Sequence, residues 1–246
     1  MSESNITGIV LRRWDAGESD RKLSLLTEEH GRMEVIAKGA RKGNSRLSGV
    51  TEPLSVCSFA IAAGKHRSFI TQAQPLTSFP GLRTDYTRLT MAMSFVELLH
   101  AFAQIDQVNA ELFQHAWIAL KALELHVKPL VALLWSELIF MSIEGILPSF
   151  DHCVLDGHRL VENPAWISAM AGGHIDSAHS NEFSDRQLVD AEILIGLAKL
   201  SKLDRPPLAF KAALASFGVL SAFWYHHAHK NLPAREALAH HLTELQ

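Results

Sequence analysis

The side chains best suited to chemistry lie in a glycine-containing basic loop that follows a short alternating strand. Four of its cations can each neutralise a phosphate: Lys38, Arg41, Lys42 and Arg46. Gly39 and Gly43 allow a ligand to approach the backbone closely. From Arg32 to Arg46 there are five cationic side chains against one carboxylate. This pattern favours a surface that binds a polyanion, the alternative being a loop that is basic only for solubility.

Four further cations extend this candidate surface: Arg12 and Arg13 at the end of the first predicted strand, and Lys65 and Arg67 in the last hairpin turn. For these four, a binding role and ordinary surface charge remain open alternatives. Single-strand binding also uses aromatic platforms, and Trp14 and Phe69 are the candidates, although each is typical of a core or rim residue. We therefore expect binding through the phosphate backbone, tolerant of sequence and sensitive to salt.

Charge is distributed unevenly along the 246 residues. Residues 1–90 hold 13 Lys or Arg and 9 Asp or Glu, a balance of +4, whereas the remainder holds 10 and 17, a balance of −7, which gives the total of −3. The N-terminus has no secretory signal pattern, and the most apolar stretch, 130–146, is interrupted by charge, so no membrane segment is expected. Two distant cysteines, Cys57 and Cys153, suit a reducing cytosol.

Five short runs separated by glycines predict a small β domain in the first third of the chain. The runs are Ile6–Trp14, Arg21–Leu26, Arg32–Lys38, Leu54–Ala62 and Ser68–Gln74. Such a set, with its longest link between the third and fourth runs, is typical of an OB-type Greek-key barrel, and an SH3-like barrel has a similar signature. The predicted fold class is α+β, with an OB-fold nucleic-acid-binding domain at 1–80 and an α-helical domain at 81–246.

The second part of the chain has helical periodicity interrupted once. Asn109 is expected to cap a helix, and 128–145 is apolar on all sides, as in a central buried helix. Ser184–Gln187 reads as a capping box that opens a helix to about Lys202. Pro206-Pro207 is expected to start another helix that reaches His229, and Pro233 to open the last. Residues of about 148–183 lack periodicity and are interpreted as an irregular insert.

The order of several short motifs resembles the RecO family of bacterial recombination mediators in the RecFOR repair pathway. The motifs are Gly8-Ile-Val-Leu-Arg12, Gly17-Glu-Ser-Asp20, Leu26-Thr-Glu-Glu-His-Gly31, Ala37-Lys-Gly-Ala-Arg-Lys42 with Ser45-Arg-Leu47, Asn109-Ala-Glu-Leu-Phe113, Glu144-Gly145 before Pro148, and Cys153 with Gly157. The resemblance runs from about residue 6 to residue 230. It implies an OB fold, then a helical bundle interrupted by a zinc-finger-like insert.

Zinc-binding relatives, as the resemblance implies, carry two CxxC-type cysteine pairs in the insert. At the corresponding positions this chain has Cys153, Asp156, Asp176 and His179. Zinc accepts carboxylate and imidazole, but structural zinc relies on soft thiolates, and only one remains. We interpret the finger as degenerate and expect no metal and no cofactor, the alternative being a rewired zinc site made of these four residues. Without metal, apolar packing is expected to hold the insert through Leu155, Trp166, Ile167 and Met170.

The resemblance implies a protein that binds single- and double-stranded DNA, anneals strands, and acts with RecR and the C-terminal tail of single-stranded-DNA-binding protein so that RecA loads. No nucleophile elbow, phosphate-binding loop or zinc-protease motif is present, so we predict that the protein is not an enzyme. We expect it in the cytoplasm, associated with the nucleoid. Two alternatives stay open: an OB-fold RNA-binding module, and a metal-dependent hydrolase that uses the insert.

Overall fold

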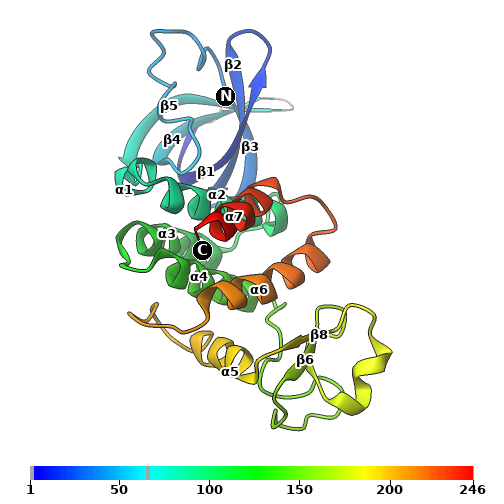
Figure 1. Cartoon of the computed structure of the whole chain (residues 1–246). Coiled ribbons are helices and arrows are strands. Elements are labelled where there is room, and N and C mark those ends of the chain that lie inside the picture. Colours follow the sequence, from blue (N-terminus) through cyan, green and yellow to red (C-terminus); the bar gives the residue numbers. More distant parts are fainter. Residues whose placement is uncertain (1–2, 65–66, 246) are drawn as a thin grey trace. The chain divides into compact units, whose positions relative to one another are not determined.

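The computed structural model describes residues 3–64 and 67–245 (Figure 1). Lys65, one of the predicted DNA-binding residues, lies outside the described residues. The chain forms two compact units. One unit contains the residues up to Glu124 together with Ala234–Leu238, and the other contains Leu125–Pro233 together with the residues from Ala239 onward.

The first unit is built around a closed five-stranded barrel, drawn in blue to cyan in Figure 1. Its strands are β1 (Glu3–Ala16), β2 (Asp20–Thr27), β3 (Gly31–Ala37), β4 (Val56–Ala63) and β5 (Ser68–Thr77). They close in the order β1-β2-β3-β5-β4, with β3 and β5 parallel and the other pairs antiparallel. This is an OB-type barrel, and all five predicted strands are confirmed.

Strand alternation decides which side chains fill the barrel and which stay outside. Leu23 and Leu25 on β2 and Val35 and Ala37 on β3 lie in the apolar core. Their sequence neighbours on the same strands therefore project outward, because successive side chains of a strand point to opposite faces. The outward set of β2 and β3 includes Lys22, Ser24, Glu34 and Ile36. The outward set thus contains charged, polar and apolar side chains, whereas the inward set is uniformly apolar.

The first unit also contains the helices α1 (Pro80–Thr84), α2 (Tyr86–Phe102) and nearly all of α3 (Ala110–Leu125). The carboxylate of Asp85 caps α2 by accepting the Arg88 N–H at 3.1 Å. The Asn109 side chain caps α3 by accepting the Leu112 N–H at 2.9 Å, as predicted. Helix α2 packs on β1 and β2, where Nδ1 of His100 lies 3.0 Å from Oγ of Ser24.

The remaining helices are α4 (Pro129–Ile143), α5 (Ala191–Leu200), α6 (Ala213–Ala228) and α7 (Pro233–Glu244). Helix α4 is buried along most of its length, as its uniform apolarity predicted. Its one buried carboxylate, Glu137, accepts the indole N–H of Trp224 on α6 at 2.9 Å. Among the described helices, none combines the length and the apolar character that crossing a membrane requires.

Two predicted helix starts are wrong. Ser184–Gln187 does not open a helix, because the Asp185 carboxylate instead accepts Ser168 Oγ and the Met170 N–H, which holds a turn. Helix α5 begins at Ala191, with Asp190 as its cap. Likewise α6 begins at Ala213 rather than at Pro206-Pro207, whose surroundings form irregular turns.

The insert is not wholly irregular. It contains a small sheet in the order β7-β6-β8, made of β6 (Ala165–Ser168), β7 (Gly173–Ile175) and β8 (Gln187–Val189), with a 3₁₀ helix, η1, at Ser177–Glu182. Strands this short carry almost no periodic signal. Ile167 is buried as expected, but Leu155 is 46% and Met170 56% exposed, so the predicted apolar packing is wrong for these two.

Candidate nucleic-acid interface

The basic loop is held against the turn that joins β1 and β2. The Gly39 N–H donates to Asp20 Oδ1 at 2.8 Å, and the Arg41 N–H donates to the Ser19 carbonyl at 2.9 Å. The Gly39 bond, with one from the Ser19 hydroxyl and the nearby Lys38 and Lys42 charges, lowers the pKa of Asp20. The loop's backbone is therefore anchored, and its conformation does not depend on the cationic side chains alone.

Three of the four predicted loop cations remain available to a ligand. Lys38, Lys42 and Arg46 are exposed, and within the described chain none of them forms an ion pair. The Lys38 ammonium lies 4.4 Å from the centre of the Phe69 ring. Arg41 differs, since it bonds the Gly17 carbonyl at 2.9 Å and lies 3.3 Å from Asp15 Oδ2. Arg41 thus also fixes the loop to the β1–β2 turn.

The other predicted cations do not all face the same way. Arg12 lies outside the barrel over the Trp14 ring, with its guanidinium carbon 5.1 Å from the ring centre. Arg13, the next residue of the strand, bonds Glu52 at 2.9 Å, and Arg21 shares that carboxylate at 3.0 Å. Arg13 thus ties the segment before β4 to the barrel. Arg67, directly before β5, is exposed and lines a groove on the barrel surface together with Trp14.

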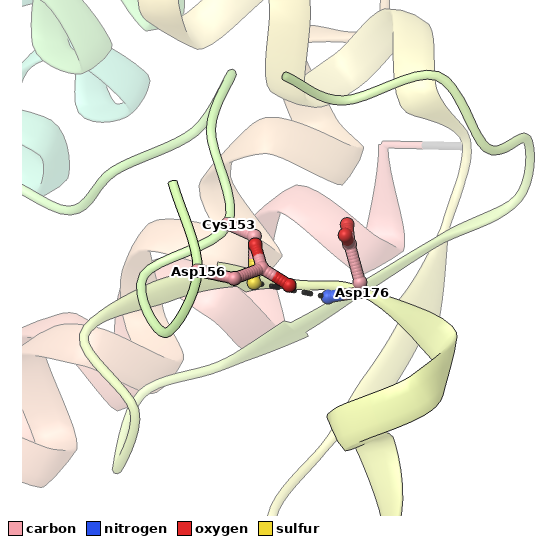
Figure 2. A group of neighbouring side chains, drawn as sticks. All are labelled: Cys153, Asp156 and Asp176. Atoms are coloured by element: carbon pink, nitrogen blue, oxygen red, sulfur yellow. Dashed lines mark hydrogen bonds between the residues drawn. The ribbon is translucent and has the colours of Figure 1, made fainter. Parts of the chain in front are cut away.

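The insert brings its predicted metal-ligand positions together (Figure 2). One donor atom each from Cys153, Asp156 and Asp176 lies within 4.8 Å of the others. The Asp176 N–H donates to Cys153 Sγ at 3.4 Å, and Nε2 of His179 lies 3.2 Å from Asp156 Oδ2. These are the four residues that occupy the finger positions implied by the family resemblance.

Two further imidazoles, those of His158 and His174, also contact this cluster, and the sequence analysis did not predict them. Nδ1 of His158 lies 3.3 Å from Asp156 and 3.5 Å from Asp176. His174 is fully buried, its Nδ1 donates to the Trp166 carbonyl at 2.9 Å, and its Nε2 lies 3.2 Å from Asp176 Oδ1. The sequence did contain a signal for His174: it lies two residues before Asp176, and residues two apart on an extended chain point to the same side.

These residues do not fit a structural zinc. The set supplies one soft ligand, and both carboxylates already face imidazoles of the chain itself. Nε2 of the buried His174 lies 3.2 Å from Asp176 Oδ1, so this carboxylate already has an imidazole nitrogen of the chain beside it. The imidazoles of His158, His174 and His179 thus surround the two carboxylates and compete with a metal for them.

This network predicts that the insert's stability depends on pH. Hydrogen bonding to Glu182, with a smaller effect of Asp156, raises the pKa of His179 above its usual 6.5. The contribution of His179 is therefore complete below pH 6.5 and is lost as pH rises through the raised value. The His158 N–H, followed by Cys153 and the nearby imidazoles, lowers the pKa of Asp156, so its contribution is lost only as pH falls below 3.8.

We expect limited proteolysis to cut the insert faster at about pH 8 than at about pH 5.5. The reason is that protonated His179 stabilises the insert and loses its proton as pH rises. The change should be smaller in His179→Gln. Treatment with a chelator should leave the cleavage rate unchanged at both pH values. Faster cleavage after chelation would show that a metal, and not the imidazoles, holds the insert.

The geometry defines an OB-type barrel with an anchored cationic loop, followed by a helical domain with a small inserted sheet. The family model described as "Recombination protein O N terminal" matches residues 1–79, and the one described as "Recombination protein O C terminal" matches residues 83–236. A DNA repair protein RecO of Anaeromyxobacter dehalogenans is 30% identical over 97% of this chain and 96% of its own length.

Two other relatives named DNA repair protein RecO have a similar level of identity to this chain. That of Heliobacterium modesticaldum is 32% identical over 80% of this chain and 72% of its own. That of Bacillus subtilis is 33% identical over 60% of this chain and 58% of its own. The chain therefore belongs to the RecO family of DNA repair proteins, and the resemblance inferred from its motifs is confirmed.

Proposed function

We propose that this protein is a non-enzymatic mediator of recombinational DNA repair that binds DNA and anneals complementary strands. The observation that carries the proposal is the anchored loop on the OB-type barrel, with exposed Lys38, Lys42 and Arg46 on its surface. Within the described residues these three cations form no ion pair, and the anchored backbone of the loop holds them where a phosphate backbone can contact them. Family membership supports DNA, rather than another polyanion, as the ligand.

The mechanism requires no covalent step. Two complementary strands repel each other through their phosphates, and a cationic surface that contacts both lowers this repulsion while base pairing supplies the driving force. As in the family pathway, the protein would act with RecR and with the tail of single-stranded-DNA-binding protein, so that RecA loads on the single strand. Its place of work would then be the nucleoid, in the cytoplasm.

A salt titration tests the electrostatic mechanism. With three to five phosphate contacts, the logarithm of the single-strand association constant should fall against the logarithm of salt concentration with a slope of about −2 to −3.5. Fluorescence anisotropy of a labelled oligonucleotide measures it. A slope near zero would contradict the proposal. Competition by single-stranded RNA of the same length serves as the second arm, because stronger competition by RNA than by DNA would favour an RNA-binding module.

A further inference from the structure

A groove of about 360 Å³ lies on the outer surface of the barrel. It is lined by Trp14, Asp15, Ala16, Lys22, Glu34, Val35, Ile36 and Arg67. The strand register explains its floor: Trp14 pairs with Lys22, Lys22 with Ile36, and Ile36 with Phe69. These residues form one outward-facing row across four strands, so the groove rests on regular sheet and is preformed.

Trp14 is presented in this groove as a half-buried ring. Its ring meets that of His100 on α2 in an edge-to-face contact with centres 5.6 Å apart, which fixes the indole in position. Two cations lie over the ring, the Arg12 guanidinium at 5.1 Å and the Lys22 ammonium at 5.5 Å. Both belong to long side chains, and although Lys22 also pairs with Glu34, that pair is exposed and so costs little to break, whereas the indole is held by packing.

The charged side chains that line the groove determine which part of a nucleic acid can bind in it. Glu34, which pairs with Lys22 at 2.7 Å, and Asp15, which pairs with Arg41 at 3.3 Å, both line it. Carboxylates inside a groove repel a phosphate but accept hydrogen bonds from the amino groups of a nucleobase. Arg67 belongs to the lining of the groove, and Lys38 lies over Phe69, the strand partner of the lining residue Ile36, so both cations can reach the phosphates next to a bound base.

We propose that this groove binds one unpaired nucleobase, stacked on Trp14, while the basic loop holds the adjoining phosphates. The inference rests on the proposed DNA binding and adds a base-binding subsite to it. A base in a duplex is paired and stacked, so its face cannot reach the indole without unpairing. The subsite therefore gives the protein a preference for single strands that the phosphate contacts do not supply.

The test compares the full-length protein with Trp14→Ala and Trp14→Phe. Trp14→Ala should lower the affinity for a labelled single strand about 5- to 150-fold, the range for one base–aromatic stack, whereas Trp14→Phe should retain most of it. The affinity of both variants for a duplex of the same length should stay within about twofold of the unchanged protein, because phosphate contacts are kept. Trp166→Ala is the matched control, since Trp166 also lies under an arginine, Arg186, at 5.4 Å, but in the insert.

A second measurement does not depend on how the variants fold. The unchanged protein should bind a strand of abasic sites about 5- to 150-fold more weakly than an ordinary strand of equal length. Equal affinity for the two strands, or equal losses on single strand and duplex in Trp14→Ala, would overturn the base-binding subsite alone. Failure of the unchanged protein to bind either strand would instead overturn the proposed function.

Discussion

Reversing the charge of Lys38, Lys42 and Arg46 together is expected to lower single-strand affinity about 100-fold at about 0.1 M salt. The estimate follows from counterion release, which contributes about 0.7 to the salt slope for each phosphate contact and so about two decades for three contacts between 1 M and 0.1 M salt. The slope itself should decrease by about 2. Strand annealing should slow in parallel, because the repulsion between strands is no longer screened.

The structure decides which cations enter this variant. Arg41 is left unchanged, because its bonds to Gly17 and Asp15 hold the loop, and reversing it would confuse loss of structure with loss of charge. A variant with Lys121, Lys199 and Lys211 changed to Glu is the control, since it alters net charge equally at exposed positions outside the barrel. Equal losses in the two triple variants would show that only total charge matters, and no loss in either would contradict the loop as the DNA site.

Gly31→Ala is expected to destabilise the barrel by about 3 kcal/mol or more. Gly31 closes the turn between β2 and β3 at φ +67°, and a Cβ there would overlap the carbonyl oxygen of Gln107. That carbonyl is backbone, in the segment that pairs with Arg32 on β3, so it cannot move aside without breaking the Asp106 N–H bond to the Arg32 carbonyl at 2.9 Å. The free energy of unfolding in urea measures the effect.

Gly17→Ala is the matched control for that experiment. Gly17 also lies at positive φ, +68°, but nothing lies within 4 Å of the Cβ that it would gain. Its cost should be about 1–2 kcal/mol, the usual penalty for a left-handed conformation with a side chain. The difference between the two substitutions isolates the steric overlap, and equal losses would show that backbone conformation alone sets the requirement for glycine at position 31.

The outcomes for particular residues show where sequence reasoning succeeds. Alternation in Met33–Lys38 and the Asn109 cap depend on neighbours within a few residues, so both were predictable. The capping box at Ser184–Gln187 failed because Asp185 binds Ser168 and Met170, which are distant in sequence. Helix propensity and capping patterns depend on neighbouring residues, so they could not show that Asp185 would bind Ser168 and Met170 instead. The division at residue 80 stays a prediction, since the first compact unit extends to Glu124.

By itself the sequence determined the barrel strands, the family and the basic loop, because each is written in the order of neighbouring residues. Only the tertiary structure decided which cations are available to bind DNA. Arg13 pairs with Glu52 and Arg41 with Asp15, whereas Lys42 and Arg46 form no ion pair in the described chain. It also placed Trp14 in a groove and three imidazoles around two aspartates of the insert. The physical reason is that ion pairs and stacking act over a few ångströms, and the folded backbone, not the order of residues, sets those distances.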